Sequence, residues 1–198
     1  APTQSTPVFF TLQAFSGAER GGGYLNSLQF TTWLDVTFYV DARDGTVYPT
    51  MVVDNTVWFV ADYRHASPGS YVYGDAKLPP AAPAGLLYTE AAAHANVPDG
   101  WRLPSADDWQ RLWNAFARPA AQPAGPPPKA WTGFNAQLGG NRDNLGTYRD
   151  LNERGWYWAS GTDAQGDNYV EISSASSSLT PGQMPYAFAM SVRYVRDL

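Results

Sequence analysis

The side chains that most often carry out chemistry are scarce in this 198-residue chain. Cysteine is absent, which excludes thiolate nucleophiles, thiolate metal sites and disulfides. The two histidines, His65 and His94, lack the spacing of a metal-ligand pair. No serine lies in a nucleophile elbow, and no glycine-rich loop lies in a strand–helix unit that could hold phosphate. Because no nucleophile, base and orienting group can be assembled, we expect that the protein is not an enzyme.

Carboxylates offer a second chemistry, the binding of a hard cation. Asp143, Asp150, Asp163 and Asp167 lie in a loop-rich part of the chain, and loop carboxylates are the ligands that calcium prefers. Their spacing differs from that of an EF-hand loop. We therefore predict that the protein has no cofactor, and a structural calcium ion is the alternative.

A third set of side chains, polar and aromatic, lies near the C-terminus. In residues 168–174, Val170 and Ile172 alternate with Tyr169, Glu171 and Ser173, so a strand here would have one apolar and one polar face. Tyrosine and serine are typical of adaptable binding surfaces, because tyrosine supplies rigid area and serine supplies small hydrogen-bonding groups. The alternative is the solvent-facing side of an ordinary antiparallel sheet, and the residues alone favour that alternative.

Composition narrows the class of protein. Hydrophobic residues make up 44% of the chain, aromatic residues 15% and charged residues only 16%, with 18 glycines and 16 prolines. This balance is typical of a fold rich in strands and loops. The net charge is −5 and no basic run occurs, which argues against nucleic-acid binding. No apolar stretch is long enough to span a membrane.

Alternating apolar and polar residues predict several strands. Asp54-Asn55 is a turn signal inside one of these segments and predicts a hairpin there. Proline-rich segments at 77–85 and 118–128 predict long surface loops. The predicted strands cover residues 8–15, 28–40, 47–61, 155–159, 168–172 and 188–195.

Helices are predicted over two segments, residues 86–95 and 105–117. In the second, Ser105 and Asp108 form a Ser-x-x-Asp capping box, and the charge of Asp107 and Asp108 suits a helix start. The predicted elements follow the order strands, two helices, loops and further strands. This order predicts an α+β fold with antiparallel sheets. The apolar residues of the second helix recur with the helical period and should form one buried stripe, which is Trp109, Leu112, Trp113 and Phe116.

Several motifs follow one another in a fixed order along the chain. They are Asp41-Ala-Arg-Asp-Gly45 with Tyr48, Gly100-Trp-Arg-Leu-Pro-Ser105 with Trp109, Gly139-Gly-Asn-Arg142, Gly155-Trp-Tyr-Trp-Ala-Ser160 and Ser191-Val-Arg193. Together they resemble the Fibrobacter succinogenes major paralogous domain, a branch of the C-type lectin fold. The resemblance implies a C-type-lectin-like domain over residues 41–198. Residues 1–40 would then be a β-rich N-terminal extension that could pack with that domain.

The same fold and ending are similar to those of the variable proteins of diversity-generating retroelements. In such proteins, adenine-directed mutagenesis rewrites codons whose side chains lie on a solvent-facing surface. The resemblance implies an extracellular or cell-surface protein whose residues 143–186 contain a face for a macromolecular or cell-surface ligand. The alternative is a structural component of a surface appendage or envelope. The oligomeric state stays open. The candidate ligand-binding residues are Asp163, Asp167, Asn168, Tyr169, Glu171, Ser173, Ser174, Ser176 and Tyr186.

The chain departs from two chemically active relatives of the lectin fold. Formylglycine-generating enzymes work through cysteine, which this chain lacks. Calcium-dependent sugar binding uses Glu-Pro-Asn or Gln-Pro-Asp with Trp-Asn-Asp, and none of these occurs. Arg142 and Arg193 are predicted to pair with buried carboxylates or carbonyls, because the guanidinium fork suits structural bridges. Trp101 is predicted to be a buried aromatic residue whose loss unfolds the domain.

Overall fold

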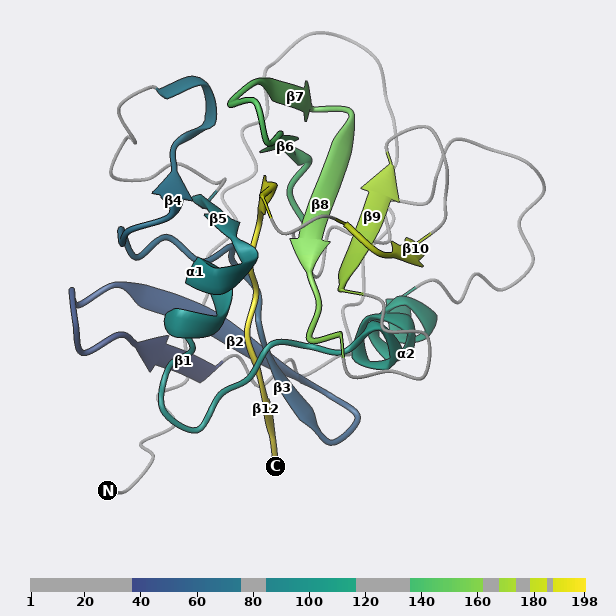
Figure 1. Cartoon of the computed structure of the whole chain (residues 1–198). Helices are drawn as coiled ribbons and strands as arrows, with labels where there is room; N and C mark the ends of the chain where they lie inside the picture. The colour runs from purple at the N-terminus through teal and green to yellow at the C-terminus, as the bar shows by residue number, and fades with distance from the viewer. Residues whose placement is uncertain (1–36, 76–84, 117–135, 162–167, 174–178, 185–186) are drawn as a thin grey trace, which may run out of the picture.

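A computed structural model describes residues 37–75, 85–116, 136–161, 168–173, 179–184 and 187–198. Within them the chain forms two sheets and two α-helices (Figure 1), which confirms the predicted α+β class. The smaller sheet has four strands in the order β1-β2-β3-β12. These strands are β1 (Thr37–Val40), β2 (Val47–Val53), β3 (Thr56–Phe59) and β12 (Val195–Asp197).

The larger sheet has eight strands in the order β10-β9-β8-β6-β11-β5-β4, with β7 paired to β6. It is mixed, whereas the sequence predicted antiparallel sheets. The reason is that β7 pairs antiparallel with β6 and a tight turn then leads into β8, so β8 runs parallel to β6. Its strands are β4 (Ser70–Tyr71), β5 (Leu87–Thr89), β6 (Gly139–Arg142), β7 (Tyr148–Leu151), β8 (Arg154–Trp158), β9 (Tyr169–Ser173), β10 (Leu179–Gly182) and β11 (Ala189–Met190).

The predicted hairpin within residues 47–61 is confirmed, with Asp54 in the left-handed region at φ 52°. The predicted strand 188–195 is instead two strands, β11 and β12, one in each sheet. Between them the backbone changes partners, since Val192 accepts a hydrogen bond from Tyr63 and Tyr194 accepts one from Phe59. The C-terminal segment therefore joins the two sheets.

The helices are α1 (Glu90–Ala95) and α2 (Ala106–Phe116), and a short 3-10 turn covers Tyr73–Asp75. The first predicted helix begins later than expected, because Leu87–Thr89 is strand β5. Strands β4 and β11 flank β5 and pair with its backbone. The strand therefore satisfies the backbone N–H and C=O groups of these residues better than a helix would. Thr89 then caps α1 by accepting a hydrogen bond from the Ala92 amide. No helix in the described part of the chain is long and apolar enough to cross a membrane.

Two clusters of buried side chains hold the fold together. The first lies between the smaller sheet, α1 and one face of the larger sheet, and its largest fully buried members are Tyr48, Phe59, Tyr63, Tyr88, Trp158 and Tyr194. The second lies between α2, the other face of the larger sheet and the smaller sheet, and it includes Met51, Trp58, Trp109, Leu112, Tyr157, Val170 and Ile172. The predicted stripe of α2 is thus confirmed for Trp109 and Leu112, with Trp113 packed at its border.

The two arginines that were predicted to form structural bridges, Arg142 and Arg193, have different kinds of partner. Arg193 Nε lies 2.7 Å from Asp62 Oδ1, and neither side chain is exposed to solvent. Tyr157 Oη donates to the same carboxylate, so this prediction is confirmed for Arg193. Arg142 instead lies over the ring of Tyr71, with its Cζ 4.1 Å from the ring centre. That geometry is a cation–π contact.

The Asp-x-Arg-Asp-Gly motif forms the turn between β1 and β2. Asp41 is buried and receives hydrogen bonds from Arg43 Nε, Arg43 Nη2 and Tyr63 Oη. Gly45 has φ 75° and donates to the Asp41 carbonyl, which explains the glycine because other residues rarely adopt this conformation. Residues 37–40, which the sequence analysis placed in the extension, pair with β2 in this hairpin.

The capping box at the start of α2 is confirmed. Ser105 Oγ accepts from the Asp108 amide at 3.0 Å, and Asp108 Oδ2 accepts from the Ser105 amide at 2.8 Å. Asp108 also pairs with Arg102 and Arg111. Burial by itself raises the pKa of Asp108, but hydrogen bonds from Arg102 and Ser105 outweigh this effect and lower the pKa to about 2.

Replacing Asp108 with asparagine should therefore make stability less dependent on acid pH. A carboxyl whose folded pKa is depressed contributes stability above its unfolded pKa and loses it as pH falls toward the folded pKa. We expect Asp108→Asn to cost about 1–2 kcal/mol at pH 7, with the deficit closing between about pH 4 and pH 2. Urea unfolding at a series of pH values measures this, and Asp107→Asn, at an exposed neighbouring position, is the matched control. A deficit that stays constant down to pH 2 would contradict the assignment.

Candidate ligand-binding face

Strand β9 presents the alternation that the sequence predicted. Val170 and Ile172 are buried against the α2 side of the sheet, whereas Tyr169, Glu171 and Ser173 are partly exposed on the opposite side. Cross-strand register places Trp156 of β8 opposite Glu171 and Arg154 opposite Ser173. We call the set formed by Arg154, Trp156, Tyr169, Glu171 and Ser173 the β9 face. Trp156 is its buried member, with 9% of its surface exposed, and the other four are partly or fully exposed.

Aromatic rings form the centre of the β9 face. The rings of Trp156 and Tyr169 lie 5.3 Å apart at 41°. Tyr169 also lies across β10 at Gly182, where an added Cβ would approach Tyr169 Oη to 2.7 Å. The glycine is therefore needed for this tyrosine to lie flat against the neighbouring strand, and the ring is held in place on both sides.

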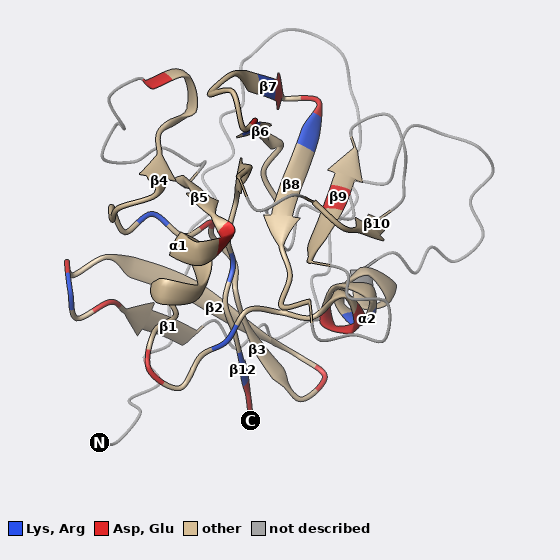
Figure 2. Ribbon diagram, viewed as in Figure 1, with Lys and Arg blue, Asp and Glu red and all other residues tan. Residues whose placement is uncertain are grey.

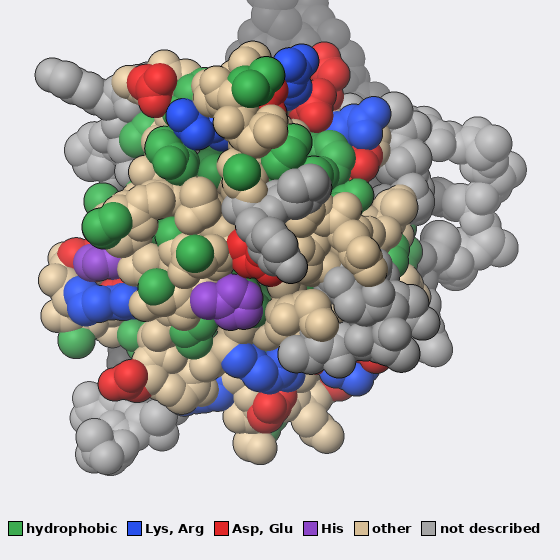
Figure 3. Space-filling view, viewed as in Figure 1, with side chains coloured by type: hydrophobic (Ala, Val, Ile, Leu, Met, Phe, Trp, Pro, Cys, Tyr) green, Lys and Arg blue, Asp and Glu red, His purple; other side chains and the backbone are tan. Residues whose placement is uncertain are grey.

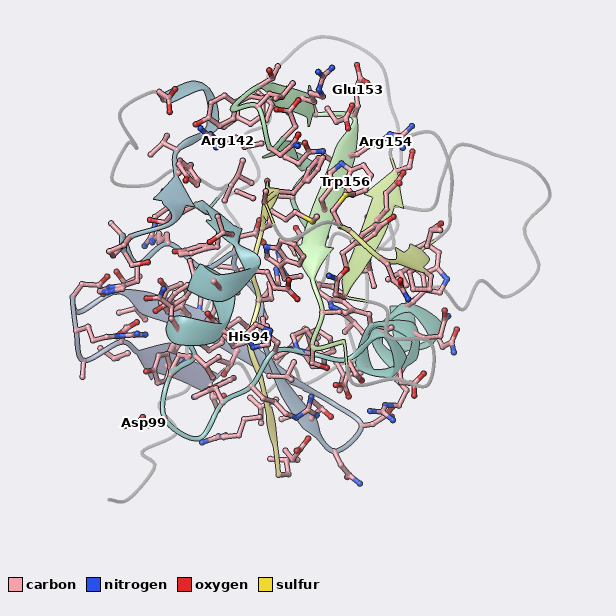
Figure 4. The ribbon with its side chains drawn as sticks, in the orientation of Figure 1. His94, Asp99, Arg142, Glu153, Arg154 and Trp156 are labelled. Atoms are coloured by element: carbon pink, nitrogen blue, oxygen red, sulfur yellow. The ribbon has the colours of Figure 1, made fainter. Side chains whose placement is uncertain are left out.

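An ion pair crosses the two strands beside the rings. Arg154 Nη1 lies 2.8 Å from Glu171 Oε1, and both side chains keep some exposure to solvent. Figure 2 shows these opposite charges next to each other on β8 and β9, and Figure 4 shows Arg154 and Trp156 close together along β8. The face is thus nearly neutral, with polar groups around an aromatic centre.

Asn168 does not belong to the exposed face, although the sequence placed it there. Its side chain is buried, its Nδ2 donates to the Met184 carbonyl at 3.0 Å, and its Oδ1 accepts from the Met184 amide at 2.8 Å. Both ends of the amide are thus used to tie the start of β9 to the segment after β10. This reciprocal bridge is a structural role, which the polar character of asparagine alone could not reveal.

Two buried polar atoms near this side of the sheet have no hydrogen-bond partner within the described part of the structure. They are Nε1 of Trp156 and Oε2 of Glu90. Glu90 begins α1, and its other carboxylate oxygen lies 3.5 Å from Asn168 Nδ2. Buried donors and acceptors are nearly always satisfied in folded proteins. A ligand or an ordered water could therefore complete the bonding of both atoms.

A comparison of the sequence with models of known protein families agrees with the order of motifs along the chain. The model of the Fibrobacter succinogenes major domain matches residues 32–196. The chain belongs to this family. The match includes β1 to β11 completely and ends inside β12. No curated protein matches the chain, and no solved structure matches it.

In this member of the family, only some of the predicted site residues can be located. Tyr169, Glu171 and Ser173 share the β9 face, and Asn168 is buried beside it. Arg154 and Trp156 were missed by sequence reasoning, although the alternation of Gly155-Trp-Tyr-Trp could have indicated that Trp156 faces one side. The remaining predicted residues lie outside the described residues, and these are Asp163, Asp167, Ser174, Ser176 and Tyr186.

The two described carboxylates of the alternative calcium set have other partners. Asp143 Oδ2 pairs with Arg149 at 3.0 Å, and Asp143 Oδ1 accepts from the Leu145 and Thr147 amides. These hydrogen bonds, led by that from Thr147, lower the pKa of Asp143. Asp150 Oδ2 lies 3.4 Å from Asn141 Nδ2. Asp143 thus closes the β6–β7 turn, and the other two members, Asp163 and Asp167, lie outside the described residues.

One cluster with metal-ligand chemistry comes together in the turn after β1. Oxygen or nitrogen atoms of Asp41, Asp44 and His65 lie within 4.8 Å of one another. However, Arg43 donates to both carboxylate oxygens of Asp41, and a guanidinium at this position repels a cation. Asp44 accepts instead from the imidazole of His65 at 2.8 Å. The three side chains therefore have hydrogen-bond partners within the chain, and Arg43 with Asp41 and His65 with Asp44 connect the turn after β1 to its surroundings.

Proposed function

We propose that this member of the family is a non-enzymatic ligand-binding protein of the receptor or adhesin type, and that its β9 face contacts the ligand. The observation that carries the proposal is the ordered centre of that face. Trp156 and Tyr169 are fixed against each other, and Trp156 keeps a buried N–H without a partner among the described residues. Rigid aromatic area with small polar groups around it is the composition of an adaptable binding surface.

The ligand would be a macromolecule or a cell-surface group, and the protein would act outside the cell or at its surface. The net charge of −5 and the mutual neutralisation of Arg154 and Glu171 on the face speak against a nucleic-acid partner, which needs a basic surface. No cofactor is required for this kind of binding.

The finer proposal is a C-type-lectin-like variable protein of a diversity-generating retroelement. Its support is the resemblance of the motifs and the position of the β9 face near the C-terminal part of the chain, where such proteins are diversified. A genomic search tests it directly. We expect a second, near-identical copy of the 3′ coding stretch that differs at adenines and lies beside a reverse transcriptase gene. A genome without such a copy would remove the diversification proposal and leave ligand binding to the direct test.

The second candidate is a structural component of an appendage or envelope. It is favoured by a different surface, where the outer strand of the smaller sheet leaves large apolar side chains exposed. Such side chains are typical of assembly contacts when they gather in one patch. These residues are Phe38 and Val40 of β1 with Val47 of β2, which is the cross-strand partner of Val40.

A variant of the β9 face tests ligand binding. We expect Tyr169→Ser combined with Glu171→Ala to weaken binding more than about 10-fold to any ligand found on glycan or protein arrays, because both side chains lie on the face. The free energy of unfolding should fall by only about 1–2 kcal/mol, since Tyr169 is half-buried. Arg149→Gln removes an exposed, salt-bridged side chain on β7 and serves as the control. A folded double variant that binds every ligand as the parent does would sink the proposal.

A further inference from the structure

A cavity of about 470 Å³ opens between the two helices. It is lined by the end of α1, the loop that leads to α2 and the first turns of α2. Figure 3 shows an exposed histidine side chain near the middle of this surface with basic side chains below it, and Figure 4 places His94 between α1 and α2 in the same view. The volume is in the range of small-molecule sites.

The walls of the cavity are mostly apolar. Val97, Trp101 and Leu103 line it from the connecting loop. Leu103 is buried in the first core cluster, and Val97 and Trp101 pack against that cluster. The apolar wall is therefore supported from behind, so it can present a fixed surface to an apolar or aromatic group.

The polar lining of the cavity is biased toward positive charge. Among the described residues that line it, Asp108 is the one acidic side chain, and this carboxylate already accepts hydrogen bonds from Arg102, Arg111 and Ser105. Arg102 also holds Asp197 through two hydrogen bonds, so its guanidinium is fully engaged. The N-terminus of α2 adds a positive partial charge at the same place.

Arg111 differs from Arg102 in having donor capacity left. Its side chain is 57% exposed, and its guanidinium bonds to Asp108 through Nη2. Its Nε and Nη1 have no hydrogen-bond partner among the described residues. A guanidinium with N–H groups that its carboxylate partner does not use can receive a second carboxylate. His94, also in the lining and exposed, offers a further N–H donor.

We propose that this cavity is a binding site for a small amphipathic carboxylate, with its apolar or aromatic body on Val97, Trp101 and Leu103 and its carboxylate at Arg111 and His94. A free metabolite-sized acid and the C-terminus of a peptide that ends in an apolar residue share this chemistry. The site is separate from the β9 face and does not depend on the function proposed for that face.

Titration calorimetry of the full chain with 3-phenylpropionate tests the site. We expect saturable binding with a dissociation constant on the order of 1 mM, which is typical of a fragment of this size. The uncharged 3-phenylpropanamide should bind at least about 10-fold more weakly, because it cannot form charge-assisted bonds with Arg111. Inorganic phosphate should compete poorly, since it leaves the apolar wall uncovered. Absence of saturable binding, equal binding of the amide or tighter binding of phosphate would each overturn the proposal.

Two matched arginine variants locate the binding. Arg111→Gln should weaken 3-phenylpropionate binding about 10-fold. Arg149→Gln should leave binding unchanged, because Arg149 is 59% exposed and paired with Asp143 but lies on β7. Thermal melting of each variant verifies that both remain folded. Equal affinities for the two variants would place the ligand elsewhere and contradict the site.

A short peptide ending in phenylalanine, with a free or an amidated C-terminus, distinguishes the two sources of the carboxylate. Competition by the free-acid peptide alone indicates a chain terminus as the natural ligand, whereas no competition indicates a free acid, and both results agree with the proposed chemistry. The Tyr169→Ser/Glu171→Ala variant should bind 3-phenylpropionate as the parent does. This site and the β9 face can thus fail independently of each other.

Discussion

Replacing Arg193 with methionine should lower the free energy of unfolding by about 3–5 kcal/mol, because it leaves the carboxylate of Asp62 buried without its counter-charge. Neither side chain is exposed, and Arg193 Nε lies 2.7 Å from Asp62 Oδ1. Burial raises the pKa of Asp62, and Arg193 opposes this rise through its charge and its hydrogen bond. Urea unfolding of the parent and the variant at pH 7 measures the loss.

The pH dependence of the Arg193→Met variant gives a second readout. Without Arg193, the folded pKa of Asp62 should rise further above its unfolded value, so the folded state binds the extra proton. Stability then falls as pH rises, and the deficit should be larger at pH 8 than at pH 5. A deficit independent of pH would argue against an ionised Asp62 as its cause.

Two controls distinguish the effect of breaking the buried ion pair from the effect of losing any arginine side chain. Arg154→Met breaks the partly exposed pair with Glu171 and should cost only about 0–1 kcal/mol. Asp62→Leu combined with Arg193→Met removes both charges, and we expect it to recover much of the loss, because buried ion pairs can often be replaced by apolar residues. If the double variant is no more stable than Arg193→Met, the unpaired carboxylate is not the source of the effect.

Replacing Trp109 with alanine should cost about 3–5 kcal/mol, because the indole is fully buried and its removal leaves a cavity. Trp109 is 0% exposed. Its ring lies 5.1 Å from that of Trp58 and 5.0 Å from that of Tyr157. The residue therefore joins α2 to both sheets, and denaturant unfolding followed by circular dichroism measures its contribution.

Trp113→Ala is the matched control on the same helix. Trp113 packs only at the border of the same cluster, so its loss should cost about 1–2 kcal/mol. Equal losses for the two variants would contradict the assignment of Trp109 as the anchor of α2. Trp101, which the sequence predicted as the critical buried aromatic residue, is only partly buried, and its ring lies 5.3 Å from the Arg196 guanidinium. Its loss should therefore be tolerated better than that of Trp109.

Features that depend on neighbouring residues could be predicted from the sequence. The capping box of α2, its stripe of Trp109 and Leu112, and the turn at Asp54 all follow from spacings of four residues or fewer. The alternation of β9 is equally local, so it predicted which side chains share a face. The α+β class and the family followed from the order of such local signals along the chain.

The candidate site could be predicted only in part. Tyr169, Glu171 and Ser173 were assigned to one face correctly, but the sequence could not show that β8 pairs beside them. Arg154 and Trp156 were therefore missed. Asn168 looked like any polar residue of a binding loop until its bridge to Met184 became visible.

The sequence by itself determined the local elements, the α+β class and the motifs that define the family, because periodicity, capping and turn preferences act over a few residues. Only the tertiary structure decided that Leu87–Thr89 is a strand, that β8 runs parallel to β6 and that β12 lies beside β3. The tertiary structure also determines that Asp62 is the partner of Arg193. These outcomes join segments far apart in the chain, and they depend on how all buried surfaces and backbone hydrogen bonds are satisfied together.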